Sequence, residues 1–217
     1  MMKYGITGIA LGIAAVYSIS LLLWGGEVSG KLVVLLVFSD PVMYGFLFVS
    51  VIVLFEKDAS IHQALAITPM PARRYLWSKA IAFSLLALAC SLLIIFAAQP
   101  EILHLTVFIF AVLASALLFV FVAISGVSYV RNFNQFFLMM PVVLTPVCLP
   151  FLDFFNLWHS PLLYIIPTQA CLLLFEASVS NAEEWEIIYG VSYLLIWIVV
   201  GFLHALYSYK TRILHKN

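Results

Sequence analysis

The sequence predicts an all-α integral membrane protein that crosses the bilayer six times. Of its 217 residues, 65% are hydrophobic and only 9% are charged, whereas an ordinary soluble domain has about 25% charged residues. A soluble domain of this length must cover its surface with polar groups, and this composition does not supply them. Six apolar segments also approach the length of about 20 residues that a helix needs to cross the hydrocarbon core.

The six predicted spans form a single transmembrane domain over residues 1–217. We take the first as a retained span rather than a cleaved signal, and the six cover residues 4–24, 35–55, 79–98, 104–125, 134–152 and 187–209. If the N-terminus is cytoplasmic, only Lys31 among the basic residues falls outside. Those inside are Lys3, Lys57, Arg73, Arg74, Lys79, Arg131, Lys210, Arg212 and Lys216. The positive-inside rule therefore predicts that both termini are cytoplasmic.

The segment between the fifth and sixth spans is external in this topology. Its apolar part, 161–175, is split by Pro167, and a helix of this length reaches only about 22 Å, which is too short to cross. Irregular backbone at membrane depth must be shielded by protein. We therefore predict a re-entrant or interfacial pair of half-helices over 158–176, with a helix lying flat on the outer leaflet as the alternative.

A cytoplasmic loop, "FEKDASIHQALAITPMPARRYLWSK" at 55–79, contains a short amphipathic pattern. Apolar residues and a threonine recur at i, i+3, i+4 and i+7, namely Ile61, Ala64, Leu65 and Thr68, which predicts a helix over 58–69. Asp58 or Ser60 can cap its start, and Pro69 ends it. Its free face suits either a soluble partner or the inner leaflet, and periodicity alone does not decide between them.

The motifs do not support catalysis, metal binding or nucleotide binding. Gly25, Gly30 and Lys31 have the spacing of a phosphate-binding loop, but Leu32 stands where that loop needs a hydroxyl. Ser125, Ser128 and His204 lack the Gly-x-Ser-Gly setting of an intramembrane serine protease. The histidines show no metal-ligand spacing, and the distant cysteines Cys90, Cys148 and Cys171 suggest no disulfide. Zero net charge gives no reason to expect nucleic acid as a partner.

Asp40, directly before Pro41, is the one ionisable residue near the outer end of the second span. It either caps a helix that begins at Pro41 or lines a polar cavity, and the two roles are compatible. With Tyr44 and Phe48 it forms our set of candidate pathway-lining residues.

The run "SDPVMYGFLFVSVIVLFEKDASIHQALAITPMPARRYLWSK" resembles the membrane subunits of type-2 ABC exporters. In that family the second span ends in Glu and a basic residue, then come a helix ending in Thr-Pro and a Tyr-Leu pair before the third span. Asp40, Pro41, Gly45 and Phe48 are similar, more narrowly, to permeases of fluoroquinolone-type drug export, and "IIPTQACLLLF" at 165–175 is similar to their external region. Such permeases usually begin with an amphipathic cytoplasmic helix, whereas here the first predicted span starts almost at once. The residues that match the first motif are Glu56, Lys57, Ala64, Leu65, Thr68, Pro69, Met70, Tyr75, Leu76 and Lys79.

The resemblance implies a permease without catalytic residues, located in a bacterial cell membrane. It implies that a separate ATPase subunit binds ATP and Mg²⁺, and that a second copy or a related permease completes the pathway. The residues it assigns to coupling with the ATPase are Glu56, Lys57, Asp58, Ile61, Ala64, Leu65, Thr68 and Pro69. The alternative is a secondary transporter or channel that works without an ATPase, which the scarcity of ionisable residues in the spans disfavours.

Overall fold

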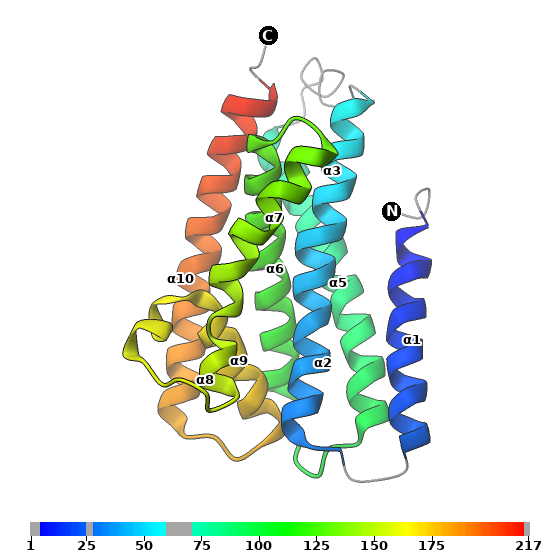
Figure 1. The fold of residues 1–217 in the computed structure, drawn as a ribbon, viewed down its shortest axis with the longest axis vertical. Coiled ribbons are helices and arrows are strands. Elements are labelled where there is room, and N and C mark those ends of the chain that lie inside the picture. The colour runs from blue at the N-terminus through cyan, green and yellow to red at the C-terminus, as the bar shows by residue number, and fades with distance from the viewer. Residues whose placement is uncertain (1–4, 25–27, 60–70, 215–217) are drawn as a thin grey trace.

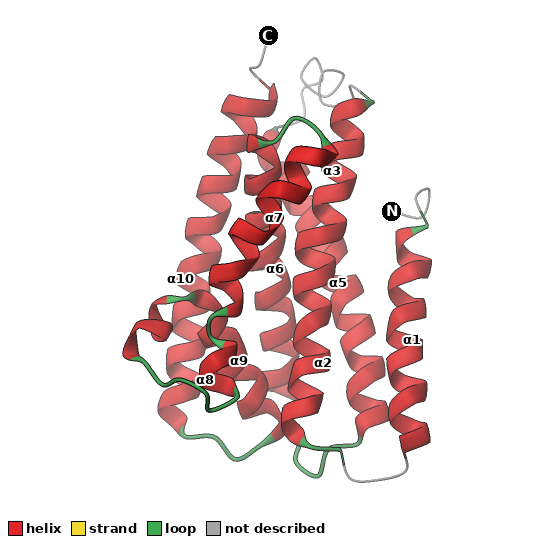
Figure 2. Cartoon of the chain, viewed as in Figure 1, coloured by secondary structure: helices red, strands yellow, loops and turns green. Residues whose placement is uncertain are grey.

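The computed structural model describes residues 5–24, 28–59 and 71–214, apart from the side chains of 40–44 and 214, as a bundle of helices (Figures 1 and 2). No strand occurs in these ranges, which confirms the all-α prediction. The elements are α1 (Ile6–Trp24), α2 (Gly30–Val42), the π-helix η2 (Met43–Phe48), α3 (Val49–Asp58), α5 (Ala72–Ala98), α6 (Leu105–Tyr129), α7 (Phe133–Cys148), α8 (Phe151–Phe154), the 3₁₀-helix η3 (Pro161–Ile165), α9 (Pro167–Val179), α10 (Glu184–Tyr209) and the π-helix η4 (Lys210–Leu214).

Four helices in the described part of the chain are long and apolar enough to cross a membrane: α1, α5, α6, and α10 with its extension to Ile213. The other two predicted spans are interrupted. The second consists of α2, η2 and α3, which follow one another in a single column (Figure 1). The fifth consists of α7 and the short α8. The membrane character of the chain is therefore supported, and the count of six spans stays a prediction.

The column of α2, η2 and α3 begins before the second predicted span, and its helix continues through Pro41. α2 starts at Gly30 and includes Asp40 and Pro41, so the prediction that Asp40 caps a helix begun by Pro41 is wrong. A proline inside a helix removes one backbone donor, and here the helix widens into the π-helix η2 directly afterwards, as helices commonly do at such interruptions. The cap prediction failed because a proline does not always start a helix.

The helix that contains the third predicted span, α5, starts at Ala72. Pro71 precedes its first turn in an extended conformation, which suits the residue before a helix. Lys79 therefore lies about two turns inside α5 instead of at its start. The start of a helix does not mark where it enters the membrane, so the span over 79–98 stays a prediction. A paired charge such as that of Lys79 is tolerated inside a helix bundle.

α6 is the central helix of the bundle and packs against α2, η2, α3, α5, α9 and α10. Its residues are buried on all sides, in keeping with a sequence that is apolar around the whole helix. In contrast, α1 packs mainly on α5, and α7 buries only Phe136. Large apolar faces of these two helices are left on the outside of the chain.

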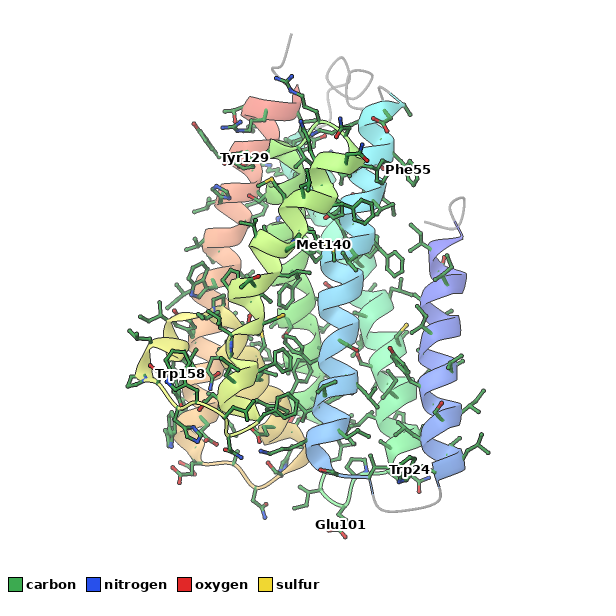
Figure 3. All side chains as sticks on the ribbon, in the orientation of Figure 1. Trp24, Phe55, Glu101, Tyr129, Met140 and Trp158 are labelled. Atoms are coloured by element: carbon green, nitrogen blue, oxygen red, sulfur yellow. The ribbon has the colours of Figure 1, made fainter. Side chains whose placement is uncertain are left out.

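The two ends of the bundle differ in charge. The basic end carries Lys57, Arg131, Lys210 and Arg212, and the acidic end carries Glu101, Asp153, Glu176, Glu183, Glu184 and Glu186. Figure 3 shows Phe55 and Tyr129 near one end and Trp24 and Glu101 at the other. This separation has the sense that the positive-inside rule predicts.

The predicted pair of short helices is present at the acidic end. η3 and α9 meet at Ile166, and α9 is inserted between α2, α6 and α10 with residues 168–175 buried. The hydroxyls of Tyr189 and Tyr193 on α10 donate to the carbonyl oxygens of Tyr164 and Ile165, each at 2.5 Å. These contacts fasten η3 to α10, while the choice between a re-entrant pair and a helix lying flat on the outer leaflet stays a prediction.

Candidate functional site

Glu56, near the end of α3, forms a buried ion pair with Lys79 of α5. Its carboxylate also accepts a hydrogen bond from the hydroxyl of Tyr75. The side chains of Glu56 and Lys79 are only 12% and 17% exposed, so water screens their attraction poorly. Because Glu56 lies before segment 60–70 and its two partners lie after it, this contact ties together the two helices from which the segment emerges.

An aromatic stack joins the same group to α10. The rings of Tyr75 and Tyr209 lie 4.9 Å apart with an interplanar angle of 20°, and Tyr209 is almost completely buried. The ammonium of Lys79 lies 5.5 Å from the centre of the Tyr75 ring, within cation–π range. This stack therefore links the start of α5 to the end of α10.

Lys57 connects α3 to the end of α6. Its ammonium donates to the carbonyl oxygens of Val127 and Val130 at 2.8 and 2.9 Å. Carbonyl groups in the last turn of a helix have no partner within the helix, and a cation there is stabilised by the helix dipole. Lys57 thus supplies the cap that the α6 terminus needs.

We call this group of five residues the stem cluster: Glu56, Lys57, Tyr75, Lys79 and Tyr209. It joins α3 and α5, the helices before and after segment 60–70 in the sequence, to α6 and α10. Of the residues predicted to contact an ATPase, Glu56 and Lys57 therefore have partners within the chain, and Asp58 is the exposed last residue of α3. The others, Ile61, Ala64, Leu65, Thr68 and Pro69, lie outside the described residues, so their role stays a prediction.

The candidate pathway residues are not brought into one cavity by any described contact. The side chains of Asp40 and Tyr44 lie outside the described part of the chain. Phe48, at the end of η2, is partly buried and packs against the hydrophobic residues in both halves of the bundle. Its position is that of a packing residue between α2 and α3.

Comparison with known proteins agrees with this architecture. The model of the fluoroquinolones export permease protein family matches residues 4–217. The chain belongs to that family. Two relatives, the fluoroquinolones export permease proteins of Mycobacterium tuberculosis strains CDC 1551 / Oshkosh and H37Rv, are each 27% identical over 164 residues, which cover 73% of this chain and 68% of the relative. The resemblance inferred from the 40–79 region is therefore confirmed.

The permease brings together Ser125 and His204, two of the residues considered above for an intramembrane serine protease. Ser125 Oγ is hydrogen-bonded to His204 Nδ1, while the Tyr129 hydroxyl lies 3.4 Å from Nε2. A serine nucleophile also needs its histidine oriented by a third group, usually a carboxylate. No described carboxylate contacts His204, so this pair lacks the arrangement of a protease.

Another polar group lies in a hollow of about 250 Å³ at the acidic end. The Asp153 carboxylate contacts His159 Nδ1 at 2.5 Å and accepts from Gln169 Nε2 at 2.6 Å. Burial raises the pKa of Tyr164, and the negative charge of Asp153 adds to that effect. No group of His, Cys, Asp or Glu in the described ranges could hold a metal ion.

Sequence reasoning found most of the stem cluster residues of the permease but did not group them. Glu56 and Lys79 carry opposite charges on the two sides of one loop in a strongly apolar chain. Because charged side chains at membrane depth need partners, their pairing could have been predicted. Tyr209 was missed because an aromatic residue near a span end carries no signal that distinguishes it from an interfacial anchor.

Proposed function

We propose that the permease is the membrane-spanning subunit of an ATP-driven exporter whose ATPase is a separate chain. In this proposal it crosses a bacterial cell membrane six times, and the basic end with both termini faces the cytoplasm. The stem cluster is the observation that carries the proposal. It links the end of α3 and the start of α5, which flank segment 60–70 in the sequence, to α6 and α10. A segment that receives force from a partner needs such a connection to the helices.

We propose the following coupling step. Segment 58–69 docks on the ATPase through the face formed by Ile61, Ala64 and Leu65. When the ATPase closes on ATP, the segment moves and carries the ends of α3 and α5 with it. Lys57 passes the motion to α6, and the Tyr75–Tyr209 stack passes it to α10. Nucleotide then shifts the permease between two packed arrangements by binding one of them better.

A second permease copy, or a related permease, completes the pathway in this proposal. α7 offers a surface for it, since Phe137, Leu138 and Val142 on this helix are 62%, 76% and 70% exposed. An exposed apolar face of this kind must be covered by lipid or by another chain. We propose fluoroquinolone-like aromatic drugs as the cargo, because both relatives are named for fluoroquinolones export.

Two substitutions that add the same charge to opposite faces of the predicted helix test the coupling face. Leu65→Asp places a carboxylate on the apolar face and is expected to abolish stimulation of the partner ATPase while membrane insertion stays normal. Gln63→Asp adds the same charge on the opposite face and is expected to keep stimulation. The measurement is ATP hydrolysis by the copurified complex in lipid vesicles. Normal stimulation by the Leu65→Asp variant would remove the assignment of this face.

The alternative of transport without an ATPase is tested in the same vesicles. Drug accumulation by the permease alone, equal with and without the ATPase and ATP, would show a secondary transporter or channel. The proposal predicts transport only when the ATPase and hydrolysable ATP are both present.

A further inference from the structure

Two hollows between α6 and α10 adjoin at Tyr129 near the basic end, and we call them together the groove. Its inner part is an apolar cleft of about 320 Å³ between α6, α7 and α10, and its outer part is a basic pocket of about 650 Å³. Tyr129 lines both parts. Along α10, Trp197, Gly201 and His204 in the cleft are followed by Tyr207 in the pocket, at intervals of three or four residues, and so share one helix face.

The basic pocket contains guanidinium groups that form no ion pair within the described residues. Three cations and one anion line it (Lys57, Arg131, Arg212 and Asp58), for a net charge of +2. Lys57 already donates to carbonyl oxygens of the α6 terminus. Arg131 and Arg212 are exposed and form no ion pair with any carboxylate in the described part of the chain. The Arg212 guanidinium lies 4.1 Å above the ring of Tyr129, at the junction with the cleft.

The inner cleft has the opposite character. Its walls are formed mainly by aliphatic and aromatic side chains, and the polar pair Ser125 and His204 is hydrogen-bonded internally. Gly126 leaves space, because a Cβ added there would meet no atom within 4 Å. The mouth of the cleft is on the outside of the bundle, where Val200 is 48% exposed and Met139 is 37% exposed.

We infer that this groove binds one anionic phospholipid of the inner leaflet, with its phosphate between Arg131 and Arg212 and an acyl chain in the cleft. The inference rests on the orientation given under Proposed function. Guanidinium groups bind phosphate through paired hydrogen bonds, and basic pockets between helices on the cytoplasmic side suit anionic headgroups. Tyr129 and Tyr207 stand where aromatic residues anchor at a membrane interface.

The headgroup part is tested by lipid retention. Wild-type and variant permease are purified from vesicles of equal phosphatidylglycerol and phosphatidylcholine content, and the bound lipid is measured by mass spectrometry. The wild type is expected to retain phosphatidylglycerol preferentially. The double variant Arg131→Gln, Arg212→Gln is expected to bind phosphatidylglycerol about 30-fold more weakly. This factor corresponds to about 2 kcal/mol, since each cation contributes about 1 kcal/mol. Arg73→Gln with Arg74→Gln, which removes two exposed charges outside the pocket at the same end, is the control.

The acyl-chain part is tested by filling the cleft. Gly126→Leu is expected to lower phosphatidylglycerol retention, whereas Gly8→Leu, at another open position on α1, is expected to leave it unchanged. Thermal unfolding of both variants checks that they fold. If retention is equal in the two variants, the cleft does not hold a chain. If dissolved glycerol phosphate displaces the lipid at equal concentration, the pocket is a free phosphate site, and the inference fails.

Two further outcomes separate this inference from the proposed function. Lipid retention is measured without ATPase or drug, so it is independent of transport. If the arginine variants retain lipid normally but no longer copurify with the ATPase, the pocket is a protein-docking surface. If they retain lipid but no longer bind drug, it is a substrate site. Either result would overturn the inference.

Discussion

At the residue scale, the basic end is organised by charges that have specific partners. Glu56 and Lys79 neutralise one another away from water, and Lys57 neutralises a helix terminus. A buried ion pair adds little to stability by itself, because both charges lose hydration. Removing one partner is costly, because the other is left buried and unpaired. The arrangement therefore fixes the relative positions of α3, α5 and α6 more than it strengthens the fold.

Single and double substitutions should separate these two effects. Glu56→Gln leaves the Lys79 ammonium unpaired and is expected to lower the free energy of unfolding by about 3–5 kcal/mol. Glu56→Gln combined with Lys79→Met removes both charges and is expected to cost less than the single change. The measurement is thermal or denaturant unfolding in detergent, with exposed Glu101→Gln as the control, expected within about 0.5 kcal/mol of wild type. A double variant less stable than Glu56→Gln would contradict this account.

Glu176 on α9 makes stability depend on pH in a predictable direction. Burial raises the pKa of its carboxyl group, Lys31 opposes that effect, and Glu186 and Asp153 add to it. A raised pKa means that the folded state holds the proton more tightly than the unfolded state. This contribution to stability is therefore fully present below the ordinary carboxyl pKa, and it is lost as pH rises through the raised pKa.

Glu176→Gln should remove that contribution. The variant is expected to lose part of the fall in unfolding free energy that wild type shows from acidic to neutral pH. Unfolding curves measured at several pH values give the unfolding free energy of each variant as a function of pH. The control, Glu101→Gln, removes an exposed charge and should keep the pH dependence of wild type. An unchanged slope in Glu176→Gln would mean that this carboxyl does not titrate differently in the two states.

At the element scale, the interruption of the second column is the feature that sequence reasoning could not place. Hydropathy correctly located an apolar segment around 35–55, because the length of such a segment is set by the bilayer. It did not reveal that the helix continues through Pro41, because that depends on whether neighbouring helices compensate the lost hydrogen bond. The π-helix η2 lies against α6, and at Gly45 the two come so close that α6 leaves no room for a Cβ.

Gly45→Ala should disturb that packing. The added Cβ would lie 2.9 Å from Cβ of Phe119 and 3.3 Å from the carbonyl oxygen of Ala116, so one of the two backbones must shift. Overpacking of this kind costs about 1–3 kcal/mol. Gly126→Ala on α6 meets no atom within 4 Å and is expected to stabilise by up to about 1 kcal/mol, because alanine favours the helix. Equal melting temperatures for the two variants would show that η2 and α6 do not touch closely.

At the scale of the whole molecule, class and family were readable from the sequence, but the network at the basic end was not. The membrane class is readable from composition because it depends on the average polarity of the whole chain and not on which residues contact each other. A motif such as Glu-Lys before the 60–70 segment reveals family membership through residue identity alone. The partner of Tyr75 on α10 depends on how helices more than a hundred residues apart pack together, and no local pattern encodes that choice.

The six-span topology makes a prediction for the whole chain that labelling can test. In a background with Cys90, Cys148 and Cys171 replaced by Ser, single cysteines are placed at Glu101 and Asn156 of the acidic end and at Arg131 and Lys210 of the basic end. A thiol reagent that cannot cross membranes should label the first two in intact cells and the last two only after lysis, because crossings by α6, by α7 with α8, and by α10 separate them. Labelling of Arg131→Cys and Asn156→Cys from the same side would show that α7 with α8 does not cross, and would reduce the number of spans below six.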